Sequence, residues 1–182
     1  MIIDSTHFVD RPYKVPNQEE SKDFVGFIES KEADLGRKYL LGQALYTEFA
    51  AAIAAGGTLD AKWEALKSGG TYTYNNILYR YDGWVDLIRP GIFAEWIAMN
   101  GPKFTNSGYV SNAVPKEAKG LSPAPFIVKH WNEFMLKAGW ARYYAYWADC
   151  YNQENTFYGF MKANESDYTG WEFVMPPAKD YL

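Results

Sequence analysis

The chain has 182 residues, the length of a single domain, and it can bury a hydrophobic core without the help of disulfides or metals. Hydrophobic residues make up 48% and charged residues 22%, a composition that describes a globular chain and excludes a disordered one. The formal net charge of -4 offers no basic footprint for the phosphates of nucleic acid, which argues against binding through the DNA backbone.

Aromatic residues are abundant, with 15 Tyr, 7 Trp and 11 Phe. They bury large areas, and Tyr and Trp keep a polar tip that suits interfaces. The abundance therefore indicates either an aromatic-rich core or a large assembly surface. The single cysteine, Cys150, cannot form an internal disulfide, which fits a reducing compartment. We see no secretory signal and no apolar run long enough for a bilayer, so a soluble, cytoplasmic protein is expected.

The first 17 residues are predicted to form an arm. Pro12 and Pro16 prevent a regular element from continuing there. The arm either packs on its own domain or reaches a neighbouring subunit. Its apolar residues favour a short strand: Ile2, Ile3, Phe8 and Val9.

Three helices are predicted between Asn17 and the Gly56-Gly57 pair. Asn17 is a suitable N-cap, and the first helix is expected to end at residues 30–33, because one helix through the whole region would far exceed the average length. Residues 32–49 read EADLGRKYLLGQALYTEF, with apolar positions at helical spacing on either side of Gly42. Since glycine inside a helix is up to about 1 kcal/mol less favourable than alanine, Gly42 predicts a junction or a close packing point.

The next segment changes character. Residues 60–67 read as a short helix with Trp63 and Leu66 facing the core. Residues 71–81 alternate and carry Asn75-Asn76 at their centre, a pattern that predicts either a β-hairpin or an extended loop.

Two further helices are predicted, separated by a polar insertion. Residues 84–99 have helical periodicity, and Pro90-Gly91 is expected to kink or split that helix. Residues 100–122 are long for a connection, which predicts a hairpin of their own or a contact loop. Pro123 then begins a helix predicted to run to about Asn152. That helix carries a small-residue stripe and an aromatic stripe, both expected to pack in the core: Ala138, Ala141, Ala145 and Ala148, with Trp140, Tyr144, Trp147 and Tyr151.

The sequence therefore predicts a mainly α fold, a helical bundle with a small β-hairpin or long-loop insertion. Residues 157–162 add a short helix, and residues 171–182 are expected to be extended and stopped by Pro176-Pro177. We expect one domain over 1–182, with these parts: an arm at 1–17, a helical core at 18–163 with insertions near 70–82 and 100–120, and an extended tail at 164–182.

No stretch has the residue pattern of a metal, phosphate or nucleophile site. His130 and Cys150 lie about twenty positions apart on the predicted helix, roughly 30 Å, so they cannot pair as base and nucleophile. We interpret His130 as a partly buried helix residue. Carboxylate pairs at helical spacing are interpreted as solvated faces: Glu19 with Glu20, Asp60 with Glu64, and Glu29 with Glu32. We predict no catalytic residue, no cofactor and no metal.

Five stretches together form a family-like pattern. Residues 27–49 hold the most distinctive motif, E…YLLGxxLY, and KWEALKSG follows at 62–69. A helix beginning near Gly83-Trp84 comes next, then FTNSGYVSN at 104–112 and the long terminal helix. In this order the stretches resemble the head–tail connector (adaptor) proteins of tailed phages and prophages, in the branch found in phages of gut Bacteroidetes.

The resemblance implies a structural protein without catalytic residues. Such proteins form a homo-oligomeric ring beneath the portal, contact portal and tail proteins, and let duplex DNA pass without sequence-specific binding or contact with a membrane. The protein would assemble in the host cytoplasm and then occupy the virion neck. Expected contact residues lie in the two insertions: Tyr72, Tyr74, Tyr79, Phe104, Tyr109 and Val110. The structural motif comprises Tyr39, Leu40, Gly42, Leu45 and Tyr46.

Two alternatives stay open at this point. One is a non-viral helical protein that binds a ligand or peptide in an aromatic-lined groove. The other is a hydrolase whose carboxylates converge only in the folded chain.

Overall fold

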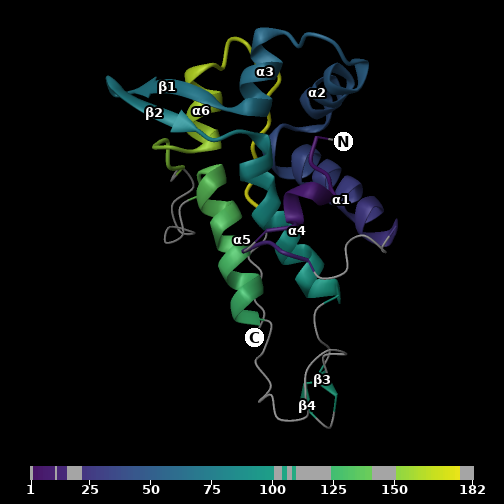
Figure 1. The fold of residues 1–182 in the computed structure, drawn as a ribbon. Coiled ribbons are helices and arrows are strands. Elements are labelled where there is room, and N and C mark those ends of the chain that lie inside the picture. Colours follow the sequence, from purple (N-terminus) through teal and green to yellow (C-terminus); the bar gives the residue numbers. More distant parts are fainter. Residues whose placement is uncertain are drawn as a thin grey trace.

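The computed structural model describes residues 2–10, 12–15, 22–100, 104–105, 108–109, 124–140 and 151–176. The described part is mainly helical, with two small antiparallel hairpins (Figure 1). The expected fold class, mainly α with a small hairpin, is confirmed.

The arm contains a 3-10 helix, η1 (Ser5–Phe8), where a strand was expected. The prediction was wrong because Asp4 caps this turn: its carboxylate accepts from the Thr6 backbone N–H at 2.9 Å, and its own N–H donates to His7 Nδ1 at 3.2 Å. Phe8 is fully buried and meets Phe24 edge-to-face at 5.3 Å. The described arm residues thus pack on their own domain.

The first helix is longer than predicted. α1 (Lys22–Leu35) runs directly into a π-helix, η3 (Gly36–Leu40), so the break expected at 30–33 is wrong. Residues 30–33 hold neither glycine nor proline. The helical segment continues to Leu40 and ends just before Gly42. The predicted start at Asn17 lies outside the described residues.

Gly42 separates η3 from α2 (Gln43–Ala55), which confirms the predicted junction. Its φ of 81 lies in the left-handed region that favours glycine. After α2, α3 (Ala61–Ser68) buries Trp63 and Leu66 as expected.

Residues 70–81 form a hairpin, which decides between the two predicted alternatives. β1 (Gly70–Tyr74) pairs with β2 (Ile77–Tyr81) in antiparallel register. The turn residues Asn75 and Asn76 have φ values of 51 and 61, as a two-residue type I′ turn requires.

α4 (Trp84–Asn100) continues through Pro90, so the helix is not split. Proline lacks an N–H, which leaves the carbonyl of Asp86 without its helical donor. Lys137 supplies the missing donor, since its Nζ lies 3.2 Å from that oxygen. Gly91 permits close packing here: a Cβ at this position would lie 3.0 Å from the Phe134 ring.

Residues of the second insertion also form a hairpin, in which β3 (Phe104–Thr105) pairs with β4 (Gly108–Tyr109). α5 (Ala124–Ala138) follows and ends well before the predicted Asn152. Gly139 adopts φ 106 and ends the helix, and Trp140 forms an isolated antiparallel bridge with Tyr151. Both predicted stripes are therefore wrong as stripes of one helix, and residues 141–150 lie outside the described part.

α6 (Phe157–Ala163) is capped by Thr156, as the predicted short helix requires. Residues 164–170 form turns, so the extended tail predicted at 164–182 is wrong there. Residues 171–176 are extended, and we call them the strap; residues 177–182 lie outside the described part. The strap pairs with the end of η3, because Glu172 N–H donates to Leu41 O at 3.2 Å and Val174 N–H donates to Tyr39 O at 2.9 Å.

The core is built largely from aromatic side chains around α4, which contacts α5, α1 and α3 (Figure 1). Trp84 and Phe49 are fully buried and meet edge-to-face at 5.3 Å. Phe134 and Phe157 are also fully buried. Much of the aromatic content thus serves the core.

Candidate functional site

The β1–β2 hairpin is the element whose side chains were predicted to meet partners. Tyr72 and Tyr79 are directly opposite each other, with ring centroids 6.0 Å apart, and Tyr74 lies next to Tyr79 at 6.4 Å. The structure therefore brings the three predicted tyrosines onto one face of the hairpin. Figure 1 shows the hairpin extending sideways from the helices with its turn outermost.

Tyr72 anchors the base of the hairpin. It is 4% exposed, its hydroxyl donates to the Gln153 carbonyl at 2.6 Å, and it accepts from the Thr156 N–H at 2.9 Å. Burial raises the pKa of this hydroxyl, so it stays protonated and able to donate. Gly159 permits the contact, because a Cβ there would lie 2.6 Å from the Tyr72 hydroxyl.

A second anchor, Tyr81, lies on the same face and closer to the open end of the hairpin, where it pairs with Gly70. The Tyr81 ring lies 4.8 Å from Phe160, and its hydroxyl donates to the Leu66 carbonyl at 3.2 Å. The base of the hairpin is thus tied to both α6 and α3, which fixes the direction in which the turn points.

The tip of the hairpin is apolar and exposed. Ile77 is 55% exposed and Leu78 is 68% exposed, whereas Tyr74 and Tyr79 are half-buried. Sequence reasoning selected the tyrosines and missed both aliphatic residues. The signal was present, because two-residue alternation places Leu78 on the face opposite the tyrosines.

The predicted contacts in the second insertion are described only in part. Phe104 lies opposite Tyr109 in the β3–β4 register. Val110 lies outside the described residues. Contact of these residues with a partner stays a prediction.

The structural motif forms the junction closed by the strap. Leu40, Leu45 and Tyr46 are buried, and Tyr39 is half-buried. The Trp171 indole N–H donates to the Leu40 carbonyl at 2.6 Å. The structure thus brings the motif residues together as a packing unit.

A polar cluster lies between the arm, α4 and α5. The Glu133 carboxylate accepts a hydrogen bond from the Tyr13 hydroxyl and lies 3.4 Å from His130 Nδ1 and 3.6 Å from Lys137 Nζ. Burial opposes ionisation of Glu133, but the Tyr13 hydrogen bond and the Lys137 charge outweigh it and lower its pKa. Burial lowers the pKa of His130, which is 2% exposed and more deeply buried than predicted.

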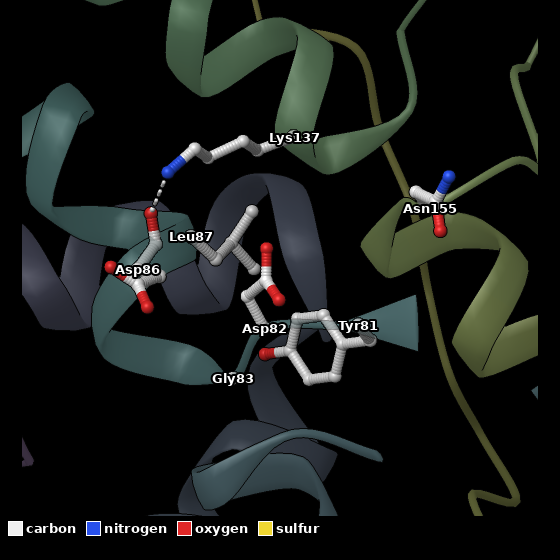
Figure 2. Close-up of a pocket in the computed structure, with 7 residues that line it drawn as sticks. All are labelled: Tyr81, Asp82, Gly83, Asp86, Leu87, Lys137 and Asn155. Atoms are coloured by element: carbon white, nitrogen blue, oxygen red, sulfur yellow. Dashed lines mark hydrogen bonds between the residues drawn. The ribbon is translucent and has the colours of Figure 1, made fainter. Parts of the chain in front are cut away.

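A small hollow adjoins this cluster, and Figure 2 shows Lys137 reaching across it to the Asp86 carbonyl. Its volume of about 20 Å³ holds roughly one water molecule, far less than a substrate needs. We therefore assign it no ligand. The residues that line it are Tyr81, Asp82, Gly83, Asp86, Leu87, Lys137 and Asn155.

Glu32 corrects the interpretation of the carboxylate pairs as solvated faces. It is 1% exposed, and its oxygens accept from the Ile2 N–H at 3.2 and 3.1 Å and from the Trp84 indole N–H at 3.1 Å. Helical spacing beside lysines did not reveal this burial, because both donors come from distant parts of the chain. Its place under the arm and its contacts give it a structural role.

Comparison with known proteins identifies no relative: no family model matches the sequence, and no curated protein or solved structure is significantly similar to it. Among the described residues, no group of three or more His, Cys, Asp or Glu is placed to hold a metal ion. No helix within the described ranges is long and apolar enough to cross a bilayer.

Proposed function

We propose that this chain is a structural protein of a tailed phage or prophage, a head–tail connector subunit that forms a ring below the portal and joins the capsid to the tail. The observation that carries the proposal is the β1–β2 hairpin, which has a base fixed by Tyr72 and Tyr81 and an exposed apolar tip at Ile77 and Leu78. A pre-ordered apolar projection loses little conformational entropy when a partner covers it.

The motif residues and the charge also support this proposal. The E…YLLGxxLY motif, on which the family resemblance rests, forms one packed junction with the strap. The formal net charge of -4 suits a ring through which duplex DNA slides without sticking. In this role the protein assembles in the host cytoplasm, occupies the virion neck, and contacts neighbouring copies, the portal and tail proteins.

The test is assembly with the portal protein encoded in the same genome. We expect negative-stain images of the mixture to show an added ring on the portal. The variant carrying Ile77→Asp and Leu78→Asp should bind the portal at least about ten-fold more weakly, because it places charges at the apolar tip. Val25→Asp is the matched control, since Val25 is 40% exposed on α1, away from the hairpin.

Two outcomes would count against the proposal. A mixture that shows no ring on the portal removes the connector function. Equal binding by the tip variant and the Val25 control removes the hairpin as the contact. The alternative, binding of a ligand or peptide in an aromatic-lined groove, would then be tested by calorimetry with peptide libraries.

A further inference from the structure

The two edges of the β1–β2 hairpin differ in how they are covered. In a hairpin with a two-residue turn, the closing pair Tyr74 and Ile77 is hydrogen-bonded, and the pairing then alternates along the strands. The backbone N–H and C=O groups of Thr71, Thr73 and Arg80 therefore point away from the partner strand. On β2, the side-chain oxygen of Asn155 accepts from the Arg80 N–H at 3.0 Å and covers that edge.

The outer edge of β1 has no such cover within the described part of the chain. No described residue forms a hydrogen bond with the outward backbone groups of Thr71 and Thr73, and both residues are exposed. Natural edge strands are commonly protected by charged residues, proline or a bulge. β1 reads GTYTY and contains no charge or proline, and its register runs without a bulge.

The β1 edge is also self-complementary. A contact across a two-fold axis requires a surface that fits a second copy of itself. Antiparallel pairing centred on Tyr72 places Thr71 of one copy opposite Thr73 of the other, a favourable cross-strand pair with no like charges in contact. The β2 edge lacks these properties, because it carries Arg80 and is covered by Asn155.

We propose that the outer edge of β1 pairs with β1 of a second copy of this chain, in antiparallel orientation about Tyr72, to form a four-stranded sheet. The anchored base presents the strand already extended, so little further ordering is needed. Because five residues bury much less area than a standard interface, the dimer is weak and forms at high concentration. A two-fold contact closes on itself and is separate from the head-to-tail contacts of a ring, so either proposal can fail alone.

The test is sedimentation of the full chain over a concentration series that reaches the millimolar range. We expect the wild type to form a dimer reversibly. Thr73→Pro should raise the dimer dissociation constant about ten-fold or more, because proline removes an edge N–H that the hairpin itself does not use. Leu78→Pro is the matched control, since it makes the same change on the other edge and should dimerise like the wild type. Circular dichroism verifies that both variants fold.

A second pair of variants tests the register. Thr71→Lys with Thr73→Glu places opposite charges face to face across the two-fold axis, whereas Thr71→Lys with Thr73→Lys places like charges there. We expect the first double variant to dimerise at least about ten-fold more tightly than the second at low salt. A wild type that stays monomeric, a Thr73→Pro variant that associates like the wild type, or equal association of the two charge variants would overturn the proposal.

Discussion

Glu32 shows how one buried carboxylate connects the arm to the helical body. Its oxygens are bonded by the Ile2 N–H on the arm and by the Trp84 indole on α4. Burial raises the pKa of Glu32 above its ordinary value of 4.5, despite these hydrogen bonds. Burial therefore makes ionisation of Glu32 harder in the folded chain than in the unfolded chain.

We predict that Glu32→Gln changes the pH dependence of stability. Since the pKa of Glu32 is higher in the folded state, the carboxyl contributes stability that is fully present below 4.5 and is lost as the pH rises through the raised pKa. The single amide oxygen of glutamine can accept from both the Ile2 N–H and the Trp84 indole, as Oε1 of Glu32 does, and glutamine has no charge to lose. The free energy of unfolding of Glu32→Gln relative to wild type should therefore increase as the pH rises above 4.5. Urea titrations at several pH values measure this difference.

Glu29→Gln serves as the control, because Glu29 is exposed on the same helix. The pH-dependent gain in relative stability should be specific to Glu32→Gln. A constant difference for Glu32→Gln would show that burial does not perturb this carboxyl.

At the scale of elements, α4 and α5 are joined at the point where proline interrupts the helical hydrogen bonds. The Asp86 carbonyl accepts from Lys137 because Pro90 has no N–H to offer (Figure 2). The repair comes from a residue 51 positions away in the chain. This hydrogen bond satisfies the carbonyl that Pro90 leaves without a donor, so α4 stays helical through Pro90.

A double-mutant cycle tests this repair. We predict that Lys137→Met lowers the free energy of unfolding by about 1 kcal/mol in the wild type, since it removes the donor to Asp86 O. In a Pro90→Ala background the helix supplies its own N–H, so the same substitution should have a smaller effect. Chemical denaturation measures the four variants, with Lys129→Met as an exposed control on α5. If Lys137→Met lowered the free energy of unfolding equally in both backgrounds, Lys137 would not be replacing the donor that Pro90 lacks.

Local sequence patterns predicted some elements well. Asn75-Asn76 marked the hairpin turn, Gly42 marked a helix junction, and Trp63 and Leu66 marked the inner face of α3, because each depends on neighbouring residues. The end of α5 was missed, since helical periodicity continues past Gly139 in the sequence while the backbone there adopts φ 106.

Features that depend on distant contacts were not predictable in this way. The burial of Glu32 depends on donors 30 and 52 positions away. For the candidate site, the tyrosines of the hairpin were found from their alternation. The hydrogen bond by which Asn155 covers one hairpin edge was not predicted, because Asn155 and Arg80 lie 75 positions apart in the chain.

On the scale of the whole molecule, the strap ties the end of the described chain to its first third. Phe173 stacks on Trp140 with ring centroids 4.6 Å apart, while the backbone of the strap pairs with residues 39–41. Gly42 lies beneath the strap, and a Cβ at this position would lie 2.9 Å from the Glu172 side chain. A side chain at this position would therefore collide with the strap.

We predict that Gly42→Ala destabilises the fold by about 1–3 kcal/mol through backbone strain and collision with Glu172. Gly57→Ala separates the two causes, because Gly57 has the same φ of 81 and nothing within 4 Å of its Cβ position. Thermal unfolding should show a larger loss of stability for Gly42→Ala than for Gly57→Ala. Equal losses would mean that the strap tolerates the added methyl group.

The strap also has a consequence for the order in which the chain acquires its structure during synthesis. The Leu40 carbonyl accepts its hydrogen bond from Trp171, 131 positions later, so this bond cannot form until Trp171 has been synthesised. Contacts of such long sequence separation slow folding. The junction at residues 39–42 therefore gains its last hydrogen bonds only after the strap has been synthesised.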